Sequence, residues 1–208
     1  MFRTISRGMD MNHINILPII LTFSLINIIF SGIASMTYGA SFNPTDLEVT
    51  DVFEGHTAPV TSVAWNPNGT WLASASSFKE NKIIIWNVST GSVIRTLIGH
   101  KDKITSIAWS PDGKSIAYLR STSDANYIMY DQPILCIAPV NGGEPVLLSK
   151  SLDRPVSTLR WNKEGTNVAV LVTDDCERYI ATYDVKTGTM NKIIGGNRSF
   201  NSLELHPN

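Results

Sequence analysis

Cysteine is scarce in this sequence of 208 residues, in which only Cys136 and Cys176 are present. Two cysteines are too few for a disulfide scaffold, and neither a C-x-x-C spacing nor a nearby histidine pair indicates a zinc site. A single bridge between them would form only in an oxidising compartment, and we interpret them as two semi-buried thiols. The sequence therefore predicts neither a metal nor another cofactor.

Charged residues are few as well. Lys, Arg, Asp and Glu make up 17% of the sequence, the formal net charge is −1, and no block is rich in Lys or Arg. Clustered positive charge is what binds a nucleic-acid backbone, so its absence argues against nucleic acid as a partner. Hydrophobic residues reach 43%, which is enough apolar material for one ordinary globular domain.

The first 34 residues differ in composition from the rest. Arg3 and Arg7 precede the uncharged stretch 14–34, in which Ile, Leu and Phe dominate. A basic start, an apolar middle and small residues before a cleavage point are typical of a secretory signal peptide, so 1–34 is predicted to form a hydrophobic helix that is cleaved after Ala34. About 20 apolar residues also suffice to span a bilayer, so an uncleaved membrane anchor is the alternative. In both cases the remainder is expected outside the cytoplasm, as a secreted, periplasmic or cell-surface protein.

After a polar linker at 35–50, the region 51–208 is built from a repeated pattern, which indicates a repeat architecture. One ten-residue pattern occurs three times, and a fourth copy begins at Phe200. The three copies are VTSVAWNPNG at 60–69, ITSIAWSPDG at 104–113 and VSTLRWNKEG at 156–165. Their steps of about 44 and 52 residues are close to the roughly 40 to 45 residues of a four-stranded propeller blade. An insertion at 119–131, between the second and third strands of the middle repeat, accounts for the longer step.

Each repeat divides into four strands that are separated by turns. In the first repeat, the apolar run 60–65 ends at a Pro-Asn-Gly turn, in which Pro fixes φ and Gly accepts a positive φ. The next strands are predicted at 71–75, 83–88 and 93–98. The sequence thus predicts an all-β fold, a partial β-propeller with blades at about 55–98, 99–149 and 152–195 and a partial fourth at 196–208. Three tryptophans recur at the repeat step and are predicted to pack in the blade cores: Trp65, Trp109 and Trp161.

These repeats resemble WD40 repeats. Gly-His dipeptides at 55–56 and 99–100 match the family's Gly-His pair, and Trp86-Asn87, with Tyr183-Asp184 more loosely, stands where the family has Trp-Asp. The resemblance implies a hydrogen-bonded network inside each blade, made by the His, a Ser or Thr, an Asp and the Trp. Its members here would be His56, Ser74 or Ser76, Trp86, His100, Tyr183 and Asp184. The network is incomplete, because the turn 77–82 has no Asp and Ala138-Pro139 replaces the second Trp-Asp pair.

The later repeats are also similar to blades of TolB-like and prolyl-oligopeptidase-type propellers, which favour a linker like that at 140–145. The WD40 resemblance implies a non-catalytic scaffold that binds a protein or peptide partner. The alternatives are the propeller portion of a prolyl-oligopeptidase-like hydrolase and a TolB-like periplasmic assembly factor. A nucleophile elbow is matched only superficially at 113–117, because Ser115 begins a strand after a turn.

The number of repeats is small for a closed ring. Propellers usually close with about four to eight blades, because closure protects the edge strands. Three repeats and the start of a fourth therefore predict either a truncated sequence or self-association of copies that completes the ring. Contact with a membrane is expected only through residues 14–34, if this segment is not cleaved.

Overall fold

The computed structural model describes residues 2–5, 19–20, 49–77, 80–100, 102–121, 132–174 and 177–195. The chain divides into two compact units, Met1–His56 and Thr57–Asn208. The first unit contains a three-stranded sheet in which β1 lies between the other two strands and runs antiparallel to both. Its strands are β1 (Phe2–Ile5), β2 (Ile19–Ile20) and β3 (Val49–Phe53).

The hydrophobic helix predicted at the N-terminus lies largely outside the described residues. Of the stretch 14–34, only Ile19–Ile20 is described, so the signal peptide and the membrane anchor both stay predictions. None of the described residues belongs to a helix with the length and apolarity that a membrane crossing requires. Of the predicted linker 35–50, only the last two residues are described, as the start of β3.

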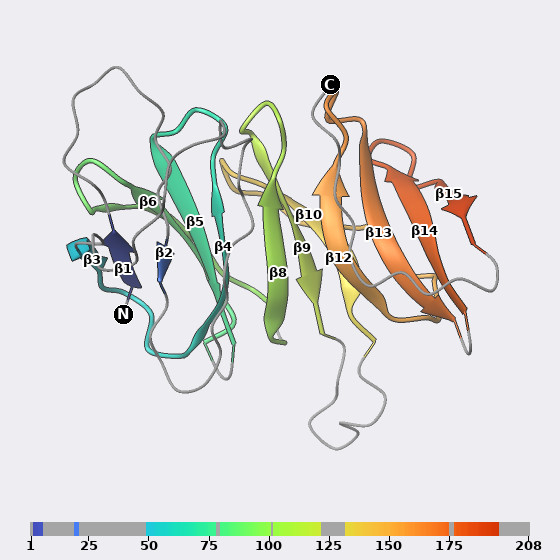
Figure 1. Ribbon diagram of the computed structural model, residues 1–208, viewed down its shortest axis with the longest axis horizontal. Coiled ribbons are helices and arrows are strands. Elements are labelled where there is room, and N and C mark those ends of the chain that lie inside the picture. Colours follow the sequence, from blue (N-terminus) through green and yellow to red (C-terminus); the bar gives the residue numbers. More distant parts are fainter. Residues whose placement is uncertain are drawn as a thin grey trace, which may run out of the picture. The chain divides into compact units, whose positions relative to one another are not determined.

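The second unit is formed by three four-stranded antiparallel sheets, each made of strands that follow one another in the sequence (Figure 1). We call these sheets the first, second and third blade. The first contains β4 (Val60–Trp65), β5 (Trp71–Ser76), β6 (Ile83–Asn87) and β7 (Val93–Leu97). The second contains β8 (Ile104–Trp109), β9 (Ser115–Arg120), β10 (Ile134–Pro139) and β11 (Val146–Leu147). The third contains β12 (Val156–Trp161), β13 (Asn167–Asp174), β14 (Glu177–Asp184) and β15 (Met190–Ile194).

The turn between the first two strands of each blade is where the sequence pattern is strictest. Gly113 closes this turn in the second blade with a φ of 68°, a left-handed conformation that glycine adopts without a steric penalty. A Cβ atom there would lie 2.8 Å from Oδ1 of Asn66, whose Nδ2 donates a hydrogen bond to the Gly113 carbonyl at 3.2 Å. The glycine of the repeated pattern therefore serves both the turn and the contact with the first blade.

The first strand of every blade carries a bulge against the second strand. The register skips one residue at Thr61, at Thr105 and at Thr158. Thr158 has a positive φ of 48°, which is uncommon for a β-branched residue. A bulge increases the local twist of a sheet, so each blade twists near the start of its first strand.

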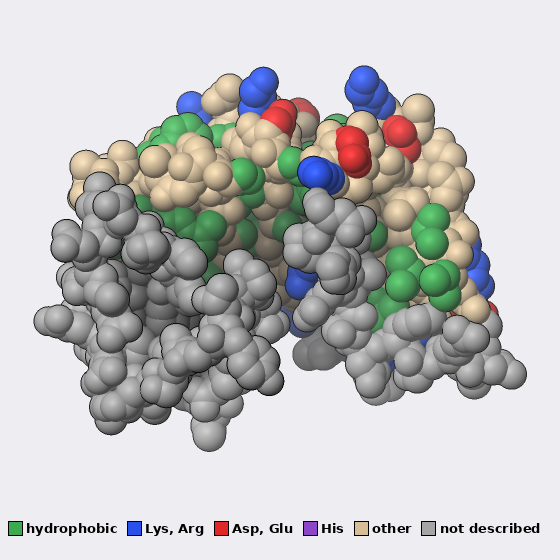
Figure 2. Space-filling view, turned by 45° about the horizontal axis from the view of Figure 1, so that its top comes forward, with side chains coloured by type: hydrophobic (Ala, Val, Ile, Leu, Met, Phe, Trp, Pro, Cys, Tyr) green, Lys and Arg blue, Asp and Glu red, His purple; other side chains and the backbone are tan. Residues whose placement is uncertain are grey.

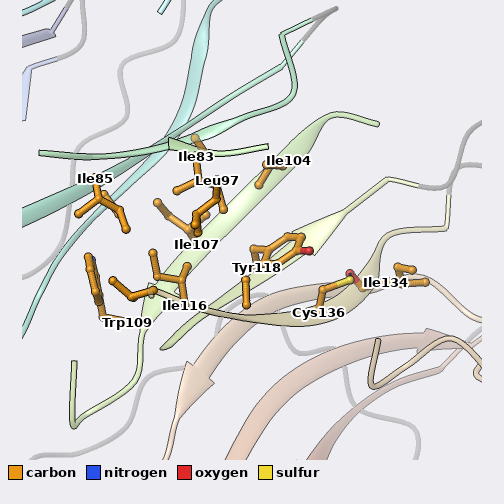
Figure 3. Close-up of a cluster of buried hydrophobic side chains, with 14 residues drawn as sticks. Ile83, Ile85, Leu97, Ile104, Ile107, Trp109, Ile116, Tyr118, Ile134 and Cys136 are labelled. Atoms are coloured by element: carbon orange, nitrogen blue, oxygen red, sulfur yellow. The ribbon is translucent and has the colours of Figure 1, made fainter. Parts of the chain in front are cut away.

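Neighbouring blades pack face to face, and β9 contributes to both contacts because its side chains alternate between its two faces. Ile116 and Tyr118 belong to the hydrophobic cluster shared with the first blade, which Figure 3 shows. Ala117 and Leu119 belong to the cluster shared with the third blade. The second blade is thus covered on both faces, which explains the continuous apolar runs of its inner strands.

The prediction of an all-β fold built from four-stranded blades is confirmed for the described residues, in which every regular element is a strand. The strand boundaries of the first repeat agree with the predicted ones to within one residue. The insertion begins later than predicted, because Leu119 and Arg120 still belong to β9. Residues 122–131 and the predicted partial blade 196–208 lie outside the described residues.

Candidate functional site

A hydrogen bond between two buried side chains lies inside the first blade. Nε1 of Trp86 on β6 donates to Oγ of Ser74 on β5 at 2.8 Å, and both residues are at most 1% exposed. Ser76 bonds elsewhere, because its Oγ donates to the Lys82 carbonyl at 3.3 Å. His56, also placed in this network by the sequence, is half-buried and ends the first compact unit. Because a buried indole N–H needs an acceptor, Ser74 holds the Trp86 ring in place.

In the second blade a tyrosine takes the place of Ser74. Tyr118 pairs with Cys136 on β10 as Ser74 pairs with Ile84 on β6. The ring of His100 packs edge-on against Tyr118, with ring centroids 4.7 Å apart and planes at 71°. Oη of Tyr118 and Nε2 of His100 are buried without a hydrogen-bond partner in the described part of the chain. An aromatic contact therefore occupies the position of the hydrogen-bonded network.

Burial controls the ionisation of this part of the second blade. Burial, and then the charge of Arg120, lowers the pKa of His100 from 6.5 to about 4, so its imidazole is neutral near pH 7. Burial raises the pKa of Tyr118 above its usual value of 10 and that of Cys136 to about 11. Cys136 is a buried free thiol, and a thiol is nucleophilic only as the thiolate. Cys176 lies outside the described residues.

In the third blade the aromatic residue is kept and its partner is lost. Tyr183 on β14 pairs with Val168 as Trp86 pairs with Leu72. The position of Ser74 is held by Val170, which cannot accept a hydrogen bond. Oη of Tyr183 is accordingly buried without a partner in the described ranges, and burial raises the pKa of Tyr183 to about 12.

The residue that follows the aromatic one closes a turn. Oδ1 of Asp184 accepts hydrogen bonds from the backbone N–H groups of Lys186 at 2.9 Å and Thr187 at 2.7 Å. These bonds, that of Thr187 first, lower the pKa of Asp184. Asn87 does the same in the first blade, where its Oδ1 accepts from the N–H of Ser89 at 3.0 Å. Asp184 and Asn87 thus have a local structural role, as Asx turns.

The recurring tryptophans connect each blade to the preceding one. Nε1 of Trp109 donates to the carbonyl of Ala64 at 2.9 Å, and Nε1 of Trp161 donates to the carbonyl of Ala108 at 3.2 Å. Trp109 and Trp161 are 6% and 8% exposed and belong to the two inter-blade clusters. Trp65 is half-buried. The indole groups therefore fix the register between blades as well as filling the core.

Two kinds of chemical site can be checked in the described residues, a metal site and the nucleophile elbow matched at 113–117. Within the described ranges, no group of three or more His, Cys, Asp or Glu side chains could hold a metal ion. Ser115 is the first residue of β9, and its N–H donates to Oγ of Ser110 at 2.9 Å. This turn leads into a strand, whereas a nucleophile elbow leads from a strand into a helix.

The exposed surface is mixed in character. Figure 2 shows Lys and Arg side chains standing beside Asp and Glu side chains on the viewed face, without a large patch of one sign. Exposed hydrophobic residues occur mainly on the outermost strands, where a blade has no further neighbour in its sheet. They include Val93, Ile94, Val146, Met190, Ile193 and Ile194.

Two residues of interest were missed by sequence reasoning. Tyr118 and Arg120 lie 44 positions after Ser74 and Ser76, so the repeat step places them at the equivalent positions of the second blade. Extending the alignment through the second strand of each repeat would have shown that an aromatic and a cationic residue replace two serines.

Comparisons with known proteins agree with this architecture. The family model described as "WD domain, G-beta repeat" matches residues 47–87 and 91–131. A segment of 50 residues is 42% identical to "Guanine nucleotide-binding protein subunit beta" from Oryza sativa subsp. indica and to the protein of that name from Zea mays. The segment covers 24% of this chain and 13% of either relative.

Proposed function

We propose, from the premise that this chain is a WD40-repeat protein, that it acts as a non-catalytic β-propeller scaffold that binds a protein or peptide partner. The observation that carries the proposal is the stack of three four-stranded blades, whose facing sides form two continuous hydrophobic clusters. Such a stack holds the loops at the blade ends in fixed positions, and loops on a rigid scaffold are the usual place for binding residues.

The chemistry of the described side chains supports binding rather than catalysis. Two polar side chains of the predicted network have structural roles: Ser74 orients Trp86, and Asp184 closes a turn. The thiol of Cys136 is buried and protonated. A general acid or base needs a pKa near the working pH and access to a substrate, and Cys136 has neither.

The alternative with a specific observation in its favour is the propeller portion of a prolyl-oligopeptidase-like hydrolase, or a TolB-like assembly factor. The second blade has Ala138-Pro139 in place of the Trp-Asp pair, followed by a Val-Asn-Gly-Gly turn in which Gly142 has a φ of 93°. In the hydrolase, catalysis would reside in a separate domain. The hydrolase alternative is therefore tested on the native protein isolated from its source, because only a product that carries the separate domain would cleave a fluorogenic proline-containing peptide.

The proposal extends to the compartment. The uncharged stretch 14–34 after Arg3 and Arg7 supports export, so the blades are proposed to lie outside the cytoplasm, either free or anchored by this stretch. A reporter enzyme that is active only after export, fused to the C-terminus of the full chain, tests the location. We expect the reporter to be active. A fusion protein that stays in the cytosol with an inactive reporter would contradict export.

The binding function is tested with a random dodecapeptide library displayed on phage and selected on the immobilised full chain. Enriched peptides are then synthesised, and their affinities are measured by fluorescence anisotropy. Saturable binding supports a defined site, and so does the displacement of one enriched peptide by another. The control is a selection on the same chain, unfolded in urea and immobilised in the same way. If the folded chain enriches no peptide beyond those found in this control, the scaffold function is contradicted.

A further inference from the structure

Three polar groups without partners gather at one end of the second blade. Tyr118 and Arg120 are two positions apart on β9 and therefore face the same side of the sheet, toward the first blade. His100, which precedes β8, packs against the Tyr118 ring. Tyr118 Oη, Arg120 Nε and His100 Nε2 are all buried and lack hydrogen-bond partners in the described part of the chain.

The hydroxyl of Tyr118 faces β10 within the apolar cluster. Figure 3 shows it pointing toward Ile134, at the end of the blade where β10 begins. Tyr118 is fully buried, whereas Arg120 and His100 are half-buried. Burial thus decreases from Tyr118 to Arg120 and His100, which are partly exposed residues at this blade end.

The positive charge of Arg120 is not neutralised by the acidic side chains of the described residues. The ion pairs in these ranges join other residues. Glu80, the acidic residue of the loop between β5 and β6, pairs with Lys82 at 2.7 Å and accepts a hydrogen bond from the Thr57 N–H at 2.9 Å. The charge of Arg120 acts on both neighbours: it adds to burial in lowering the pKa of His100, and it opposes the larger effect of burial, which raises the pKa of Tyr118.

Leaving such groups unpaired is costly. A buried donor without an acceptor destabilises a protein by about 1 to 3 kcal/mol, and more when the donor is charged. Buried polar groups without partners are rare in native structures, so three of them together call for a function or a bound group that explains them. One acceptor placed beside Arg120 and Tyr118 would satisfy a guanidinium N–H and a phenolic O–H together, and the neighbouring imidazole can donate as well.

We propose that Arg120, Tyr118 and His100 form a receptor for a carboxylate side chain, Asp or Glu, presented by the partner protein. This inference rests on the proposed scaffold function. A carboxylate carries one negative charge and two acceptor oxygens, which suits one guanidinium assisted by two neutral donors. A phosphate dianion would bring a second charge beside Ile104 and Ile134, both at most 6% exposed, where an unpaired charge is strongly disfavoured.

The inference is tested with the full chain and the dodecapeptide library described above. Peptides selected on the natural sequence are expected to share one Asp or Glu. For a synthetic peptide, Arg120→Gln is expected to weaken binding about tenfold to a hundredfold, since hydrogen bonds between charged groups are the strong ones. Tyr118→Phe is expected to weaken it about threefold to tenfold. Arg160→Gln, the same change at an exposed arginine of β12, is expected to have no effect.

A double-mutant cycle makes the test specific to the pair. Replacing the acidic residue of the peptide by its amide should weaken binding to the natural chain and have little further effect on the Arg120→Gln variant. Additive losses contradict the receptor, as do enriched peptides without an acidic residue. These outcomes leave the scaffold function standing, whereas the enrichment of no peptide contradicts the function itself. Circular dichroism and Arg120→Lys, which keeps the charge, show whether a loss of binding arises from unfolding.

Discussion

The indole Nε1 of Trp109 donates a hydrogen bond to the backbone carbonyl of Ala64, 2.9 Å away in the preceding blade. The same relationship joins Trp161 to Ala108 at 3.2 Å. One repeated residue thus provides core volume and a hydrogen bond across the blade junction. A backbone carbonyl is available in every sequence, so this contact constrains only the residue that donates.

Trp109→Phe is expected to lower the free energy of unfolding by about 1 to 3 kcal/mol, because a smaller aromatic ring replaces the indole and the Ala64 carbonyl loses its donor. Trp65→Phe is the matched control. Trp65 occupies the same position in the first blade and is half-buried, and no indole hydrogen bond joins it to the described residues. The control should cost about 1 kcal/mol or less. Urea unfolding measures both, and equal losses would show that ring size rather than the hydrogen bond matters.

Ser74→Ala is expected to destabilise the chain by about 1 to 3 kcal/mol, because the buried Nε1 of Trp86 loses its acceptor at 2.8 Å. Ser92→Ala removes a hydroxyl that is exposed and bonds to Thr90, and should change stability by about 0.5 kcal/mol or less. Urea unfolding, with Trp fluorescence as the probe, compares the two variants. A loss for Ser74→Ala no larger than that for Ser92→Ala would show that the indole does not depend on the serine.

The fold of the first repeat followed from local chemistry. The strand 60–65 ends where Pro67, Asn68 and Gly69 impose a turn, and turn residues act over four positions, which a single sequence displays. The N-terminal segment is different, because apolar composition alone fits a cleaved signal and an anchor equally well. The distinction lies in how the cell processes the segment, which the amino-acid pattern does not contain.

The candidate site was harder to predict than the fold. The sequence left Ser74 and Ser76 as alternatives, because both are small hydroxyl residues on the same face of one strand. Only the distances separate them, since Ser74 contacts the Trp86 indole and Ser76 contacts a loop carbonyl. The environment of His100 depends on Tyr118 and Arg120 from another strand, so a motif centred on the Gly-His pair did not indicate it.

Two tyrosines with unpaired hydroxyls offer a contrast between stability and binding. Tyr183→Phe is expected to leave the stability unchanged or to raise it by up to about 1 kcal/mol, because Oη of Tyr183 is buried without a partner in the described ranges. Tyr118→Phe should do the same for the free chain while weakening the binding of acidic peptides. Thermal unfolding with and without peptide measures both effects. A large loss of stability in either variant would show that its hydroxyl is hydrogen-bonded in solution.

His100 is expected to make stability depend on pH between about 4 and 6.5. Burial and the charge of Arg120 lower its pKa from 6.5 to about 4 in the folded chain. Within this window the unfolded chain binds the proton and the folded chain does not, so the stabilising effect is present above pH 6.5 and is lost as the pH falls. The expected loss is on the order of 2 kcal/mol, since partial exposure screens the effect. Urea unfolding at pH 7, 6 and 5 measures it, and His100→Phe should flatten the difference, because phenylalanine keeps the ring contact with Tyr118 and does not titrate. A variant whose stability falls with acid as steeply as that of the natural chain would assign the dependence to the carboxylates instead.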